Sequence, residues 1–129
     1  MSGETNLNHH TQSGLARGQL LGQLAPANTT AATLFTAISR TEVTLLIIAN
    51  TTATTATARV FHDEAGSTYV AGNALYYDID IPGKTSLVLD SSDNFSGITL
   101  AATDSLGVRT GTNSALTFTA YGTREYTRR

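Results

Sequence analysis

Short runs of β-branched, aromatic and other apolar residues, separated by turn-forming residues, constrain the fold of this chain most. We expect strands at 32–37, 42–49, 55–62, 75–81, 85–89, 97–100, 105–110 and 115–122. Gly, Pro, Asn and Asp lie between them, and no pattern supports a helix longer than a turn or two. This spacing is typical of antiparallel sandwiches and barrels. We therefore predict an all-β, antiparallel β-sandwich that is jelly-roll-like.

Alternation along each run predicts which side chains fill the core, because successive side chains of a strand point to opposite faces. The run 42–49 is apolar on both faces, which predicts cover on both sides. We assign Leu46 and Ile48 to a face that meets a neighbouring subunit. Pro82-Gly83 predicts a type II turn. The predicted core comprises Val43, Leu45, Ile47, Val60, Leu75, Tyr77, Ile79, Leu87, Leu89, Ile98, Leu100, Leu116 and Phe118.

The first 24 residues differ from the rest, since they are polar and sustain neither a helix nor a strand period. A disordered terminus is one interpretation. The scattered leucines favour an extended N-terminal arm that docks on a neighbouring subunit. We therefore divide the chain into an arm at 1–24 and a β-sandwich domain at 25–129. The arm's predicted assembly contacts are Leu7, Leu15, Leu20, Leu21 and Leu24.

The composition offers few groups for chemistry. Charged residues make up 14% of the chain, against about a quarter in ordinary domains. Cysteine and tryptophan are absent, and Lys84 is the only lysine. A net charge of −2 argues against a nucleic-acid partner. We find neither a secretory signal nor an apolar run long enough for a membrane span. We expect no catalytic residues, no cofactor and no metal.

Histidines provide two candidate sites. His9 and His10 are adjacent, but no cysteine or nearby carboxylate pair completes a zinc set, so a solvated or interfacial role is favoured. The sequence His62-Asp63-Glu64 ends the run 55–62. Neighbouring side chains of a strand diverge, so a turn at a hairpin end is favoured over acid–base chemistry.

Carboxylates provide two more candidates. Asp78 and Asp80 share a predicted face, where they could bind calcium or act as acid and base, but a solvated strand face is the favoured explanation. The loop with Asp90, Asp93 and Asn94 is rich in oxygen but lacks the Gly and bidentate Glu of an EF-hand. The basic end formed by Arg124, Arg128 and Arg129 indicates a solvated or subunit-contacting tail. No phosphate loop or nucleophile elbow is present.

Several strand segments form a recognisable series, namely residues 46–54 with 58–60, 74–78 with 81–82, 97–100 and 116–122, in that order. This series resembles small virion structural proteins of tailed bacteriophages. The resemblance covers about residues 30 to 123 and consists of strand sequences, not of a catalytic motif. A Pro-Ala-Gly-Lys type turn usual in the family is replaced here by Ile38-Ser39-Arg40-Thr41. The resemblance implies a β-sandwich subunit, trimeric and without an enzymatic role.

Three functions remain open at this stage. The first is a capsid cement or decoration protein, a homotrimer in the virion that clamps subunits of the major capsid protein after assembly in the host cytoplasm. The second is a neck, tail or fibre component. The third is a carbohydrate-binding module that presents Tyr69, Tyr76, Tyr77, Phe95 and Tyr121 to sugar rings.

Overall fold

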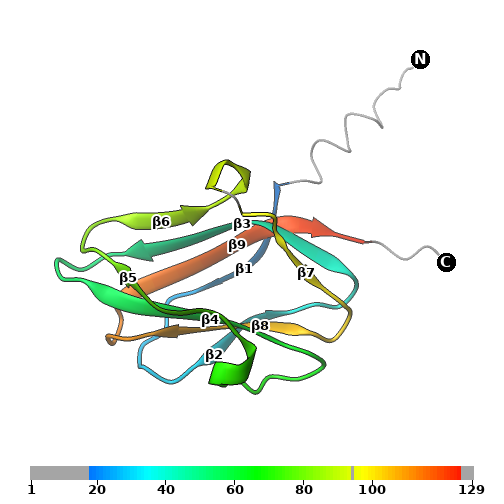
Figure 1. Ribbon diagram of the computed structural model, residues 1–129, viewed down its shortest axis with the longest axis horizontal. Helices are drawn as coiled ribbons and strands as arrows, with labels where there is room; N and C mark the ends of the chain where they lie inside the picture. The colour runs from blue at the N-terminus through cyan, green and yellow to red at the C-terminus, as the bar shows by residue number, and fades with distance from the viewer. Residues whose placement is uncertain (1–17, 94, 126–129) are drawn as a thin grey trace, which may run out of the picture.

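The computed structural model describes residues 18–93 and 95–125 and shows two antiparallel sheets packed face to face (Figure 1). The described residues form nine strands and two short 3₁₀ turns, at Ala71–Asn73 and Ser91–Asp93. The strands are β1 Gln19–Leu24, β2 Ala32–Thr36, β3 Thr41–Asn50, β4 Ala56–Asp63, β5 Ala74–Ile81, β6 Ser86–Leu89, β7 Ile98–Leu100, β8 Ser105–Thr110 and β9 Leu116–Arg124. The predicted all-β sandwich is confirmed, and every predicted strand is present.

The strand order is that of a rolled-up hairpin. The hairpin β4–β5 is its tip; β3 pairs with β6 and β7, β2 with β8, and β1 with β9. Sheet A therefore has the order β1-β9-β3-β6, with β7 beside β6 on β3, and sheet B has the order β2-β8-β4-β5. Apart from the hairpin β4–β5 and the neighbours β6 and β7, consecutive strands lie in alternate sheets, and this nested pairing is the jelly-roll arrangement.

The strand β1 changes the predicted domain boundary. Residues 19–24 were assigned to an arm, but they pair with β9 from Gln19↔Gly122 to Leu24↔Phe118. Leu21 is buried in the core, and Leu24 packs against it. The sandwich therefore begins at β1, and the boundary after residue 24 is wrong. Residues 1–17 lie outside the described residues.

A β-bulge in β3 reverses the predicted faces of that strand from Leu45 onward. Val43 pairs with Gly122 and Leu45 with Tyr121, so Thr44 is an extra residue without a partner on β9. A bulge shifts the alternation by one residue. Leu46 and Ile48 are consequently 0% exposed in the core, whereas Leu45 and Ile47 lie half-buried on the other face. The assignment of Leu46 and Ile48 to an intersubunit face is therefore wrong.

A second irregularity reverses the start of β5. Ala58 pairs with Ile79 and Val60 with Tyr76, so two residues of β5 oppose a single residue of β4. Asp78 adopts a positive φ of 56° at this point. Leu75 and Tyr77 are 44% and 48% exposed, contrary to the prediction, while Tyr76 packs against the core.

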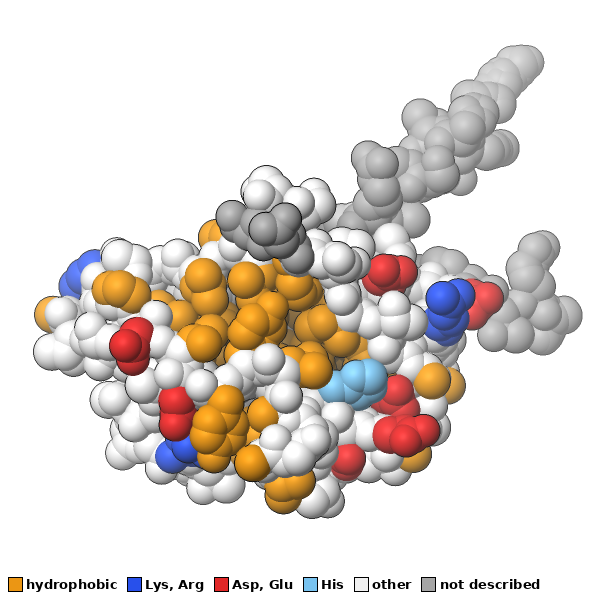
Figure 2. Space-filling view, in the orientation of Figure 1, with side chains coloured by type: hydrophobic (Ala, Val, Ile, Leu, Met, Phe, Trp, Pro, Cys, Tyr) orange, Lys and Arg blue, Asp and Glu red, His pale blue; other side chains and the backbone are white. Residues whose placement is uncertain are grey.

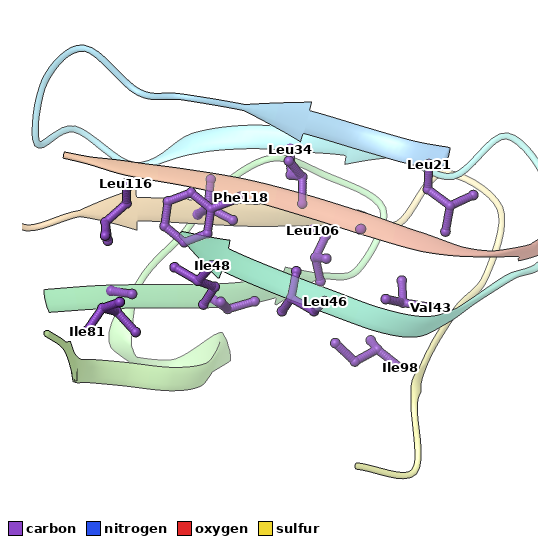
Figure 3. Close-up of a cluster of buried hydrophobic side chains, with 14 of the residues drawn as sticks. Leu21, Leu34, Val43, Leu46, Ile48, Ile81, Ile98, Leu106, Leu116 and Phe118 are labelled. Atoms are coloured by element: carbon purple, nitrogen blue, oxygen red, sulfur yellow. The ribbon is translucent and has the colours of Figure 1, made fainter. Parts of the chain in front are cut away.

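The core lies between the two sheets, where side chains from β3, β8 and β9 point toward one another (Figure 3). Six predicted core residues are buried, and Ile79, Leu87 and Leu89 are partly buried against the core. The six are Val43, Val60, Ile98, Leu100, Leu116 and Phe118.

The turn after β5 is not the predicted type II turn. Lys84, not Gly83, has the positive φ of 59°. A Cβ on Gly83 would overlap the backbone of Ala53, so this glycine permits a close approach between two loops. Buried Asn50 joins the same loops, because its side-chain amide donates to the carbonyl oxygens of Thr54 and Ile81, both at 2.8 Å.

Candidate functional site

An apolar groove opens on one side of the sandwich. Leu75 and Tyr76 of β5 form one wall, and residues 95–98, which lead into β7, form the other. The groove has a volume of about 320 Å³. Hydrophobic side chains gather in the hollow between β5, β6 and β7 (Figure 2). A cleft of this size can accept one or two apolar side chains of another polypeptide.

The jelly-roll topology explains why this side is open. β5 is the last strand of sheet B, and β6 and β7 form the last position of sheet A. Each of these edges has one side without a strand partner among the described residues. On the opposite side of the sandwich, β1 and β2 contact each other and residues 25–31 join them. We call the side between β5 and the β6/β7 edge the open flank.

A charged cluster borders the open flank on the outer face of sheet B. Arg59 donates to both carboxylate oxygens of Asp78, with distances of 2.7 and 3.0 Å, and its guanidinium lies 3.9 Å from the ring centre of Tyr77. Arg109 Nη1 lies 3.9 Å from Asp78 Oδ1. The hydrogen bond from Arg59 lowers the pKa of Asp78 below its usual value. Asp78 therefore forms an ion pair with arginine. Its side-chain partners among the described residues are arginines, so Asp78 and Asp80 do not act as a pair of carboxylates.

A buried carboxylate, Asp104, ties three loops together at one end of the sandwich. Its oxygens accept hydrogen bonds from His62 Nε2 at 2.9 Å and from the backbone N–H groups of Ala65 and Ala101, both at 3.1 Å. Its own carbonyl oxygen accepts from the N–H of Ala37. The hydrogen bond from His62, together with the two backbone donors, lowers the pKa of Asp104. All four of these hydrogen bonds hold loops in place, so Asp104 has a structural role.

As predicted, the side chains of His62, Asp63 and Glu64 do not converge on one point. His62 bonds Asp104, whereas Asp63 accepts from the N–H of Thr68 and the side chain of Asn73, and Glu64 is exposed. In the oxygen-rich loop, Asp90 accepts from the N–H and hydroxyl of Ser92. His9, His10 and Asn94 lie outside the described residues. Within 18–93 and 95–125 no three metal-ligating side chains gather.

A second, polar hollow of about 210 Å³ lies at the ends of β3 and β9, where charged side chains of both signs meet. The Nε of Arg124 is buried there without a hydrogen-bond partner among the described residues. The hollow is lined by Arg40, Thr41, Glu42, Thr123, Arg124 and Glu125. It adjoins the last described residue, Glu125, and Arg128 and Arg129 lie outside the described residues.

The leucines predicted to make assembly contacts lie in different environments. Leu20 is 51% exposed on β1, whereas Leu21 and Leu24 contribute to the core. Leu7 and Leu15 lie outside the described residues. The sequence analysis did not predict the groove. The only available signal was the pair of apolar residues Phe95 and Ile98 in the segment around Gly97.

The aromatic residues do not form one platform. Tyr69 shares its hydroxyl with Thr33 and Ser105, each at 2.7 Å, and its ring packs beside Phe61. Tyr77 lies under Arg59. Tyr76 and Phe95 both line the groove.

No family model, curated protein or solved structure matches this chain. A proposal about function therefore depends on the sequence, the fold and the groove. No helix in the described residues is long and apolar enough to cross a membrane.

Proposed function

We propose that this chain is a non-enzymatic structural subunit of a tailed-phage virion, and that it acts as a trimeric decoration protein on the capsid. The observation that carries the proposal is the apolar groove at the open flank. Exposed apolar hollows beside unpaired strand edges are typical of surfaces that meet another polypeptide.

Two further observations support this proposal. The jelly roll is a fold of viral capsid proteins, although it also occurs in lectins and cupins, so the fold alone does not select a function. The strand segments of this chain resemble small virion proteins over about residues 30 to 123.

The mechanism of a decoration protein follows from mass action. A protein that binds only the assembled lattice stabilises that lattice by RT ln(1 + [L]/Kd). A trimer multiplies this effect, because the second and third contacts form at high effective concentration. The rigid sandwich would hold the contacts in place.

The test is the copy number of the chain in purified particles made by the genome that encodes it. A decoration protein is present in hundreds of copies, whereas a neck, tail or fibre component is present in about a dozen, since one follows the lattice and the other a ring. Quantitative gel or mass spectrometric analysis separates these cases. Absence of the chain from the particles would overturn the proposal.

A carbohydrate-binding module is the second candidate, because Tyr76 and Phe95 both line the groove. Aromatic rings in a cleft can pack against sugar rings. A glycan array would detect this activity, and binding abolished by Tyr76→Ala would favour this function over the structural one.

A further inference from the structure

The apolar groove has a chemically matched occupant within the chain itself. Residues 1–17 precede β1 and carry two large aliphatic side chains, Leu7 and Leu15, among polar neighbours. The groove presents Leu75, Tyr76, Phe95 and Ile98. A single leucine flanked by small or polar residues suits a hollow of about 320 Å³ whose rim is open to solvent.

The register of sheet A locates the start of β1 relative to the groove. Gln19 pairs with Gly122, Gly122 with Val43, and Val43 with Ile98, so these residues form one row across the sheet. Three strand spacings of about 4.8 Å separate Gln19 from Ile98 by about 14 Å. The chain thus enters the sandwich at the edge opposite the open flank.

This distance excludes Leu15 of the same chain from the groove. Four residue steps lead from Leu15 to Gln19, and they span at most about 14 Å when fully extended. That length equals the straight path through β9 and β3, which the sandwich itself occupies. A path around the sheet is longer, and the wall formed by β5 lies a further sheet spacing away, about 10 Å. Leu15 can therefore fill a groove only on another copy.

We propose that Leu15 of one copy inserts into the apolar groove of the next copy. This inference rests on the proposed function, in which the chain works as a trimer. Because the donor edge at β1 and the acceptor groove lie on opposite sides of the sandwich, the contact is head to tail. Head-to-tail contacts close into rings when the rotation permits. In the proposed trimer, three such contacts close the ring.

Disulfide trapping tests the contact directly, because the natural chain contains no cysteine. The double variant carries Leu15→Cys and Leu75→Cys; Leu75 is 44% exposed, so this change leaves the core intact. Under mild oxidation we expect covalent dimers and trimers on a non-reducing gel, with the trimer as the largest product.

The matched control pairs Leu15→Cys with Ile38→Cys. Ile38 is 76% exposed and precedes β3 at the end of sheet A where β1 begins, so a loosely tethered segment reaches it more easily than it reaches Leu75. We expect at least about tenfold less cross-linking in the control. Equal cross-linking in both pairs, intramolecular cross-linking alone, or a ladder extending beyond the trimer would each overturn the proposal.

A second measurement avoids cysteine chemistry. Replacing Leu15 by Ser should raise the dissociation constant of the trimer by about tenfold or more, since a buried leucine is lost. Ala16→Ser in the same segment should leave the dissociation constant unchanged. Equal constants for the two variants would contradict the inserted leucine.

The failure of this inference differs from the failure of the proposed function. If the chain is abundant in particles but the cysteines do not cross-link, the decoration role stands and the arm contact fails. If trimers cross-link in solution but the chain is absent from particles, the arm contact stands and the virion role fails.

Discussion

Single residues decide which faces of this sandwich are apolar. Thr44 has no partner on β9, and this one extra residue moves Leu46 and Ile48 into the core. Alternation along the sequence predicted the opposite faces, because an uninterrupted run of apolar residues carries no mark of a bulge.

Two adjacent leucines test this reversal. Leu46→Ala should cost about 2–5 kcal/mol of unfolding free energy, because it leaves a cavity in the core. Leu45→Ala, which truncates a half-buried side chain on the outer face, should cost less than about 2 kcal/mol. Urea denaturation of both variants measures the difference. Equal losses, or a larger loss for Leu45→Ala, would contradict the bulge.

The carboxylate of Asp104 should make stability depend on pH. Its pKa in the folded protein is lowered, so the charged form stabilises the fold. The contribution is complete above the unfolded value of about 3.9 and is lost as the pH falls through the folded value below it.

Replacing Asp104 by Asn should therefore lower stability at neutral pH by about 1–3 kcal/mol and flatten the decline below about pH 4. The exposed Asp80→Asn variant is the control and should keep the native profile. Thermal unfolding from neutral to acid pH records both effects, and a native acid profile in Asp104→Asn would count against the role of this side chain.

Gly122 permits β9 and β3 to approach at the bulge. A Cβ there would overlap the carbonyl oxygen of Glu42, whereas a Cβ on Gly72 meets nothing within 4 Å. We expect Gly122→Ala to destabilise the protein by about 1–3 kcal/mol, because backbone must shift. Gly72→Ala should be close to neutral. Chemical denaturation of this pair checks the packing, and a neutral Gly122→Ala would show that the strands separate easily.

At the scale of elements, the first strand was the one that sequence reasoning missed. Its sequence mixes Gln, Leu and Gly without clear alternation, so its pairing with β9 is imposed by tertiary contacts and not by local propensity. The remaining strands were predicted because β-branched runs and turn residues mark them locally. The groove was not predicted, since it depends on which strands end each sheet.

Two truncations distinguish the contribution of β1 to stability from that of the segment before it. Removing residues 1–17 should leave a folded sandwich, because β1 and its partners remain. Removing residues 1–24 deletes β1, exposes the edge of β9 and takes Leu21 from the core, so it should unfold the protein or lower its stability by several kcal/mol, about 2–5. Circular dichroism during heating compares them. Equal stability would show that β1 is dispensable.

At the scale of the whole molecule, the jelly roll leaves one flank open and places the chain's entry at the other. This asymmetry suits a subunit that receives a neighbour on one side and reaches another on the opposite side. The fold class followed from strand and turn signals, whereas the location of the groove required the strand order. The structure also changes the interpretation of candidate chemistry: Asp78, considered with Asp80 from the sequence, forms an ion pair with Arg59.

Sedimentation velocity of the full-length chain tests the central claim, that the open flank joins copies of this protein. At micromolar concentration we expect one species at three times the chain mass of 13.6 kDa. Leu75→Asp at the groove should give monomers, whereas Ile38→Asp, at a more exposed apolar residue away from the groove, should keep the trimer. A monomeric natural chain, or a trimer that Leu75→Asp leaves intact, would contradict the claim.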